Sequence, residues 1–314
     1  MSFSTPTAII MKRLCIALLT LTLIIGSTLI AAGLYMLDYS LAPDPGRANT
    51  DSCYRQLFAR FPYCKPWVDS LRSNRLLRDT FVTMPTGERH HAMYVWNNSR
   101  HTAVVIHGWR DCGIKFLYLA HFYEKELGWN VVVPDLHAHG LSEGSAVGMG
   151  WLDRKDVLEW MRVFRTDSMT VHGVSMGAAT AMMMSAEAMP RGVRSVNFVA
   201  DCGYTSVWDE FSCQLKEQFG LPPFPLMYVT SALCRLLYGW SFGEADALGQ
   251  VAKSPYPMLF IHGDSDTFVP TWMALSLYAA KPGHKKLWIS PHCGHAESFA
   301  KHREEYERLI MPAR

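Results

Sequence analysis

The chain has 314 residues, of which 49% are hydrophobic and 18% charged, so it can bury a sizeable core and does not have the composition of a disordered protein. Its formal charge of +2 provides no broad positive field, which argues against nucleic acid as a partner. The 8 cysteines include no Cys-x-x-Cys pair, so they indicate neither a disulfide scaffold nor a metal site.

The first predicted element is an apolar helix, because residues 14–37 contain no charged side chain. A helix of that length covers about 36 Å, against about 30 Å of bilayer hydrocarbon. Residues 1–40 are therefore predicted to be a membrane anchor. Lys12 and Arg13 precede the apolar run, so the positive-inside rule places the rest of the chain outside the cytoplasm. A signal peptide cleaved near Ala31-Ala32-Gly33, which would give a secreted protein, is the alternative.

Residues 41–77 are expected to form a linker and an amphipathic lead-in. Two prolines and a glycine within residues 41–46 favour the linker, and apolar residues near helical spacing from about 50 to 74 indicate partly helical structure packed under a domain. If the chain is exported, Cys53 and Cys64 are the nearest cysteines that could be bridged in this segment. Free buried thiols are the alternative.

Residues 78–314 are expected to form one α/β domain. Extended runs at 81–84 and 92–96 predict an antiparallel hairpin. Strands that are apolar on both faces follow, with helices between most of them, at residues 103–106, 131–133, 169–171, 196–200 and 258–261. Such strands indicate a mostly parallel, doubly wound sheet covered by helices on both faces. Residues from about 205 to 254 interrupt this order and are predicted to form a small helical cap.

The segment Gly173-Val174-Ser175-Met176-Gly177 lies between a predicted strand and a helix that begins with small residues. Its glycines permit the sharp turn that lifts a serine hydroxyl above the edge of such a sheet. A serine hydroxyl becomes a good nucleophile only beside a base that a third group holds in place. The sequence therefore predicts Ser175 as a nucleophile and requires two partners for it.

Both partners are expected in loops that follow later strands. Asp266 is predicted to be the orienting carboxylate, with Asp264 as the alternative, and either could instead cap the next helix. His295 is preferred to His292 as the general base, because it follows a glycine and directly precedes the last helices.

Acyl transfer also needs donors for the oxyanion that forms on the attacked carbonyl. The strand at 103–106 runs into His107-Gly108-Trp109. The backbone N–H groups of Trp109 and of Met176, the residue after the nucleophile, are the expected donors. His107 is expected to hydrogen-bond locally instead of acting as a base.

Together these motifs resemble a known family. They are completed by Asp135 with His139-Gly140-Leu141-Ser142, Gly148-Met149-Gly150-Trp151-Leu152-Asp153 and Asp201-Cys202-Gly203-Tyr204-Thr205-Ser206. The chain resembles the serine aminopeptidase-like and monoacylglycerol-lipase-like branch of the α/β-hydrolases, especially membrane-anchored bacterial cell-surface hydrolases, over roughly residues 78–310. The resemblance implies the α/β-hydrolase fold with the triad Ser175, Asp266 and His295.

The resemblance also implies an activity: a serine esterase, in preference to an amidase or peptidase, that forms an acyl-serine intermediate without a metal or organic cofactor. An acyltransferase with the same triad and a non-catalytic, membrane-tethered binding module are the alternatives. Cys112 and Cys293 lie outside the family pattern; they could face each other above the active site or be unrelated buried thiols.

The predicted cap is expected to bind the acyl part of a small-molecule ester. Met227 and Trp240 are the predicted substrate-binding residues, and the wider expected lining includes Tyr228, Leu233, Leu236 and Leu237. An apolar lining favours short or medium acyl esters over peptides. The alternative is that this apolar face only packs the cap onto the sheet. Apart from the substrate and the membrane, the sequence identifies no partner.

Overall fold

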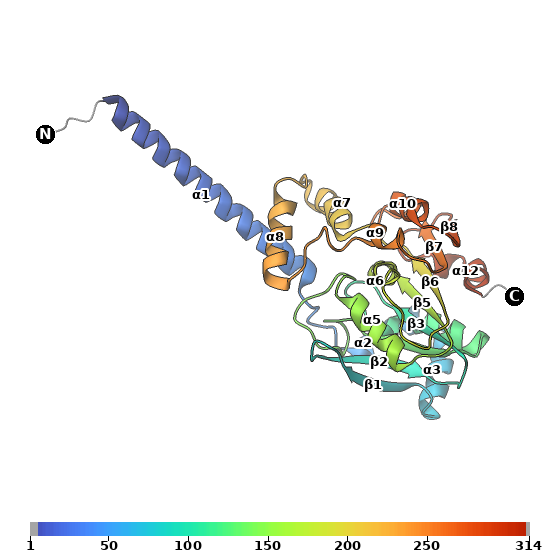
Figure 1. Cartoon of the computed structure of the whole chain (residues 1–314). Coiled ribbons are helices and arrows are strands. Elements are labelled where there is room, and N and C mark those ends of the chain that lie inside the picture. Colours follow the sequence, from blue (N-terminus) through green and yellow to red (C-terminus); the bar gives the residue numbers. More distant parts are fainter. Residues whose placement is uncertain (1–5, 312–314) are drawn as a thin grey trace.

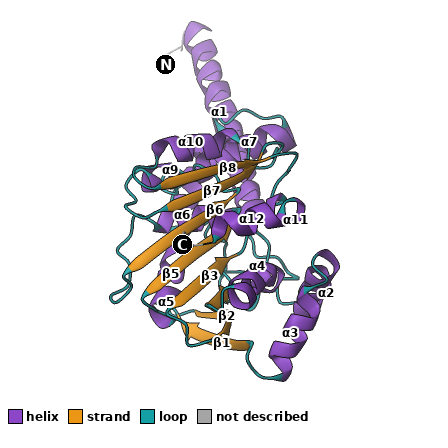
Figure 2. Ribbon diagram, turned by 90° about the vertical axis from the view of Figure 1, so that its right-hand side faces the viewer, coloured by secondary structure: helices purple, strands orange, loops and turns teal. Residues whose placement is uncertain are grey.

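A computed structural model describes residues 6–311, and these residues contain an eight-stranded sheet in the order β1-β2-β4-β3-β5-β6-β7-β8 (Figure 2). β1 pairs antiparallel with β2, and β2 antiparallel with β4, whereas all later neighbours are parallel. The strands are β1 (Arg78–Thr83), β2 (Arg89–Val95), β3 (His101–Ile106), β4 (Asn130–Pro134), β5 (Ser168–Val174), β6 (Ser195–Asp201), β7 (Met258–Gly263) and β8 (Lys285–Ser290). Because parallel neighbours end at one edge, the loops after β3, β5, β6, β7 and β8 meet there.

The central strands are apolar on both sides because helices cover both faces of the sheet. In β3, Val104 and Ile106 belong to one buried cluster, and Ala103 and Val105 belong to another. Successive side chains of a strand point to opposite faces, so the two clusters lie on opposite sides of the sheet.

Figure 2 shows these two helical layers. The first face carries α5 (Asp153–Val163), α6 (Met176–Met184), α9 (Ala247–Val251) and α10 (Trp272–Ala280). The second carries α2 (Thr50–Arg60), α3 (Cys64–Ser73), η1 (Gly113–Phe116), α4 (Leu117–His121), η2 (Phe122–Glu126), α11 (Ser298–Lys301) and α12 (Arg303–Ile310). α2 and α3 occupy the stretch for which an amphipathic lead-in was expected.

Between β6 and β7 the chain forms α7 (Val207–Phe219), α8 (Leu226–Tyr238) and α9. The Ser206 side chain caps α7 by accepting a hydrogen bond from the Asp209 N–H at 3.0 Å. Gly220 and Gly239 end α7 and α8 in the left-handed conformation that glycine adopts without strain. These helices occupy the segment expected to be a cap.

α1 (Pro6–Leu41) projects from the rest of the molecule (Figure 1). Ile10–Leu41 is long and apolar enough to cross a membrane, with a mean hydropathy of 2.4 in its most apolar window, which is compatible with a membrane anchor or a signal sequence. The end of α1, however, is part of the main core. Leu37 and Leu41 are buried, and the Val147 N–H donates to the Leu41 carbonyl at 2.8 Å. The expected linker therefore follows a helix that is already packed against the domain.

α8 lies alongside this end of α1 (Figure 1). A Cβ atom added at Gly33 would lie 2.9 Å from Leu233 and 3.3 Å from the hydroxyl of Thr230, both in α8. The absence of a side chain at Gly33 lets the two helices approach closely.

Candidate active site

Ser175 lies in the turn between β5 and α6, at the carboxyl edge of the sheet. Its backbone has φ +58° and ψ −121°, a region that a side chain rarely adopts and that the surrounding structure must enforce. A Cβ at Gly173 would lie 2.0 Å from the Gly177 carbonyl oxygen, and a Cβ at Gly177 would lie 2.2 Å from that of Ile106. Only glycine fits at these two positions. The glycines two residues before and two residues after Ser175 therefore make this tight turn possible.

Ser175, His295 and Asp266 form a hydrogen-bonded chain. His295 Nε2 lies 2.8 Å from Ser175 Oγ, and His295 Nδ1 lies 2.8 Å from Asp266 Oδ2. The three residues come from the loops after β5, β8 and β7, which parallel pairing brings to the same edge. In this arrangement Asp266 accepts from Nδ1–H, which leaves Nε2 free to accept the serine proton.

Asp266 is held firmly in its loop. Its Oδ1 accepts hydrogen bonds from the N–H groups of Phe268 at 3.0 Å and Val269 at 2.9 Å. Burial by itself raises the pKa of Asp266, but hydrogen bonds with His262 and His295 outweigh it and lower the pKa to about 2. The carboxylate is therefore ionised at neutral pH, as the orienting role requires.

The two alternative residues lie elsewhere. Asp264 is exposed, and its Oδ1 accepts a hydrogen bond from Ser265 at 2.7 Å. His292 is also exposed, and its carbonyl accepts a hydrogen bond from Lys301. Neither side chain takes part in the chain that ends at Ser175.

The loop after β3 lies directly against the serine. A Cβ atom added at Gly108 would be 3.3 Å from the Cβ of Ser175, so the backbone leading to Trp109 lies close against Ser175. Met176 is the first residue of α6, and N–H groups in the first turn of a helix have no acceptor within the helix. His107 Nδ1 lies 2.7 Å from the carbonyl oxygen of the adjacent Gly108, and its Nε2 accepts a hydrogen bond from the Leu136 N–H at 2.9 Å.

An apolar pocket opens above Ser175. Its walls come from the loop after β3, from α7 and α8, and from the last turns of α1. Among the residues that line it are Met36, Tyr39, Phe211, Leu215, Met227 and Phe268. The Tyr39 hydroxyl donates to Gln218 in α7 at 3.0 Å, which joins the α1 wall to the α7 wall.

Comparison with known proteins agrees with this architecture. The uncharacterized protein YqkD of Bacillus subtilis is 27% identical over 220 residues, which are 68% of this chain and 71% of YqkD. The esterase Pf2001 of Pyrococcus furiosus superposes with a TM-score of 0.59 at 21% identity, covering 74% of this chain and 88% of the esterase. A putative hydrolase of Agrobacterium vitis gives a TM-score of 0.57 at 17% identity, covering 75% and 99%. No family model matches the chain.

The chain has the α/β-hydrolase fold. This confirms the fold class expected from the sequence, including the antiparallel start of the sheet. In the α/β-hydrolase fold the strand-to-helix turn after the central strand carries the nucleophile, and Ser175 occupies that position here.

The cap residues predicted to bind substrate on this α/β-hydrolase scaffold fall into different places. Met227 lines the pocket. Trp240 does not, which differs from the expectation: it is 2% exposed and packs in the core near Phe242. The wider expected lining was also partly misplaced, because three of its side chains are exposed on the outer surface: Tyr228, Leu236 and Leu237.

One polar residue of the pocket was not singled out from the sequence. Glu210 of α7 lines the pocket and is 4% exposed. Its Oε1 accepts from Gln214 at 3.1 Å, whereas its buried Oε2 has no hydrogen-bond partner among the described residues. Burial raises the pKa of Glu210 to about 8, so the group is neutral at pH 7. In the sequence it is an ordinary glutamate of a polar helix, and only the three-dimensional packing reveals it.

The cysteines of the described residues are all free thiols. Cys112 in the loop after β3 donates to the sulfur of Cys53 in α2, at 2.8 Å, so it faces neither Cys293 nor the pocket. Cys53 correspondingly approaches Cys112 and not Cys64. Cys202, Asp266 and His295 place potential metal-ligand atoms within 4.8 Å of one another, but Asp266 and His295 already hydrogen-bond to each other within the chain that ends at Ser175.

Proposed function

We propose that this α/β-hydrolase-fold protein is a serine hydrolase that cleaves carboxylic esters through an acyl-serine intermediate. The observation that carries the proposal is the hydrogen-bonded chain from Asp266 through His295 to Ser175, at the floor of an apolar pocket. A serine on a strained turn, beside an imidazole with a buried carboxylate partner, is the arrangement that acyl transfer requires.

The reaction follows from this geometry. His295 Nε2 removes the hydroxyl proton as Ser175 Oγ attacks the ester carbonyl carbon. The backbone N–H groups of Trp109 and Met176 are the proposed donors to the oxyanion. Collapse of the tetrahedral intermediate breaks the bond to the alcohol oxygen, which takes the proton from His295. Water, deprotonated by His295, then attacks the acyl-serine, releasing the acid and restoring Ser175.

The pocket favours an ester with an acyl chain over a peptide. Its lining is largely apolar, and its buried glutamate is neutral at pH 7, so there is no fixed charge there to bind a free peptide terminus. We further propose that α7 and α8 form the cap that shapes this pocket, with Met227 as a substrate-binding residue.

We also propose that α1 anchors the protein in a membrane, with the catalytic domain outside the cytoplasm. The apolar length of Ile10–Leu41 and the preceding Lys12 and Arg13 support this arrangement. Carbonate washing of membranes and protease treatment from the outer side test it. Mature protein that begins near Leu34 would instead show a cleaved signal peptide.

The activity is tested by labelling the purified protein with a fluorophosphonate and by measuring kcat/KM for p-nitrophenyl esters of increasing chain length beside aminoacyl amides. We expect Ser175→Ala to abolish both labelling and ester turnover. Full labelling of that variant, or faster cleavage of the amides than of any ester, would overturn the proposal. Adding an alcohol acceptor in water distinguishes hydrolysis from acyl transfer by the product ratio, because a hydrolase releases mainly the free acid and a transferase forms mainly the new ester.

A further inference from the structure

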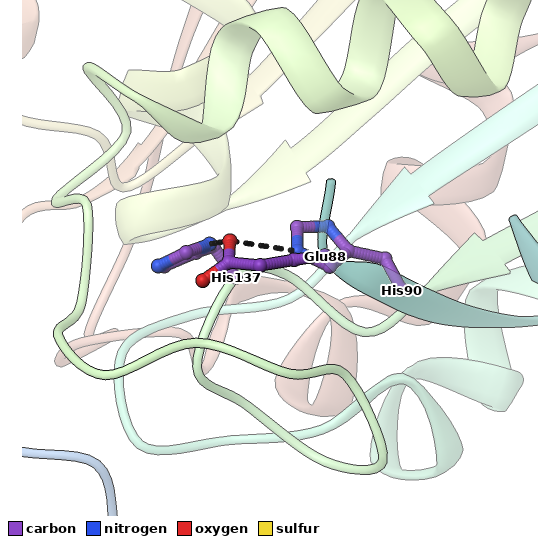
Figure 3. Close-up of side chains that lie close together, drawn as sticks. All are labelled: Glu88, His90 and His137. Carbon is purple, nitrogen blue, oxygen red and sulfur yellow. Dashed lines mark ion pairs between the residues drawn. The ribbon is translucent and has the colours of Figure 1, made fainter. Parts of the chain in front are cut away.

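Three side chains with metal-binding atoms converge where the loop after β4 meets the start of β2 (Figure 3). Glu88 immediately precedes β2, His90 lies in it, and His137 belongs to the loop after β4. Glu88 Oε2 is 3.1 Å from His137 Nδ1 and 3.8 Å from His90 Nε2. One potential ligand atom from each residue lies within 4.8 Å of the other two.

The buried state of His90 is the second observation that points to a ligand. The residue is fully buried, and neither of its ring nitrogens has a hydrogen-bond partner among the described residues. Buried polar groups almost always have a partner, so an imidazole with two unsatisfied nitrogens requires an explanation. An ion pair between Glu88 and His137 would explain those two residues but would leave His90 Nε2 unsatisfied.

We propose that Glu88, His90 and His137 bind one Zn²⁺ ion, with water as the fourth ligand. Two imidazoles and one carboxylate are a zinc-binding set, and three protein ligands leave one position open. Zn–N and Zn–O bonds of about 2.0 to 2.1 Å in a tetrahedron place the ligand atoms about 3.4 Å apart. The distances of 3.1 and 3.8 Å from Glu88 Oε2 lie on either side of that value.

The groups behind both histidines are compatible with this role. Asp156 Oδ2 lies 3.5 Å from His90 Nδ1, the ring nitrogen turned away from Glu88. Asp156 makes no hydrogen bond to His90 among the described residues, but its position behind the ring is where an acceptor for Nδ1–H stands when Nε2 binds an ion. Gly144 packs against the His137 ring on the side away from Glu88. A Cβ atom added at Gly144 would lie only 2.7 Å from His137 Nε2.

The proposed ligands are also held on a rigid frame that remains open to ions. Glu143 Oε2 accepts from the Arg89 N–H at 2.8 Å, and the Glu143 N–H donates to the Arg89 carbonyl at 3.0 Å. These bonds lock the His137 loop onto the start of β2. The side chains of Glu88 and His137 are 33% and 14% exposed, which allows a metal ion and its water to enter from solvent.

The test uses the full-length protein, purified without a histidine tag and stripped with a chelator. Zinc is then titrated in competition with a chromophoric chelator, and thermal unfolding is followed with and without zinc. We expect one Zn²⁺ per chain and a higher Tm with zinc, because a ligand bound only to the native state stabilises it. Glu88→Gln and His137→Gln should each weaken zinc binding about tenfold or more.

Matched variants locate the ion. His284→Ala removes an exposed histidine elsewhere and should leave zinc affinity unchanged, as should Ser175→Ala. Cobalt in place of zinc should give the visible absorption of a tetrahedral site, and this should be lost in His137→Gln. Failure of the folded protein to bind zinc would overturn the proposal. Binding that persists in Glu88→Gln and His137→Gln but is lost in Cys202→Ser would place the metal beside the triad instead.

Discussion

The indole Nε1 of Trp109 donates a hydrogen bond of 2.9 Å to the backbone carbonyl oxygen of Ser40. Trp109 belongs to the loop that lies against Ser175, and Ser40 belongs to the last turn of α1. The N-terminal apolar helix is therefore joined directly to the loop proposed to stabilise the oxyanion. Both residues also line the pocket above Ser175.

Trp109→Phe keeps an aromatic ring at this position but removes the indole donor. We expect the free energy of unfolding to fall by about 0.5 to 1.5 kcal/mol, the usual contribution of one hydrogen bond. Ester turnover should also fall, because the loop loses its fixed position beside the serine. Denaturant unfolding and ester kinetics check this, with Tyr39→Phe as a comparison that removes a hydrogen bond from another wall of the same pocket. Unchanged stability and unchanged kinetics would contradict it.

Asp266→Asn should lower kcat by about 10⁴-fold while the fold is retained, because the amide no longer fixes the tautomer of His295. Asp264→Asn is the matched control: it makes the same chemical change two residues earlier, on an exposed side chain that does not contact His295. Ester turnover and near-UV circular dichroism of both variants provide the measurement. If Asp264→Asn were the inactive variant, the choice between the two carboxylates would be reversed.

Met227→Ala should change the preference for acyl chain length, because Met227 lines the pocket. We expect the ratio of kcat/KM between medium and short esters to change about tenfold, since one methylene of fit contributes roughly 1 to 3 kcal/mol to selectivity. Leu236→Ala is the control, as Leu236 lies in the same helix but is 79% exposed. Equal effects of the two substitutions would show that cap stability, and not pocket shape, is responsible.

Glu210 gives the pocket a pH dependence. Because burial raises the pKa of Glu210 to about 8, the carboxyl is neutral below that pH and becomes a buried carboxylate above it. A negative charge on Glu210 makes the apolar pocket less favourable for binding an acyl chain. We therefore expect kcat/KM for apolar esters to fall as the pH rises through about 8. Glu210→Gln cannot ionise and should retain activity above that pH. The same alkaline decline in the Gln variant would exclude Glu210 as its cause.

Cys53 and Cys112 should form a disulfide if the domain lies outside the cytoplasm. The hydrogen bond from Cys112 lowers the pKa of Cys53, which favours the thiolate that attacks the disulfide of an exchange partner. The two thiols would lose two protons and two electrons, and the partner disulfide would be reduced to a dithiol. Peptide mapping without reduction, of protein taken from cells directly into denaturant with an alkylating reagent, measures this. Complete alkylation of Cys53 in protein from cells would contradict it, and Cys64 is the internal control for a thiol that stays free.

The residues brought together at Ser175 could be chosen from the sequence because each has a local signal. Two glycines flank the serine at positions that admit no side chain, and the carboxylate and histidine follow predicted strands of one sheet. Parallel pairing then brings all three loops to one edge. The choice between Asp264 and Asp266 was harder, since it depends on which side chain turns inward within a single loop.

The cap was harder to predict because an apolar helix pattern does not say what covers each face. The sequence suggested a linker after the anchor, so the end of α1 was not expected to form a pocket wall. Once α1 packs against α8, other side chains of α8 are left exposed, among them Leu236, and Trp240 beyond the helix is taken into the core. The positions of Glu88, His90 and His137 in the sequence match no recognisable metal-binding motif. Only the pairing of β2 with β4 brings the three residues together.

The packed end of α1 also determines how freely the domain can turn. A domain on a flexible tether samples many orientations above a bilayer. Here Leu37 and Leu41 are core residues, so the end of the helix is fixed to the domain without a flexible linker between them. If α1 spans a membrane, the bilayer sets both the height and the tilt of the pocket mouth. A substrate dissolved in the bilayer would then reach the pocket by lateral diffusion in two dimensions, and changes in bilayer thickness or curvature would alter its turnover.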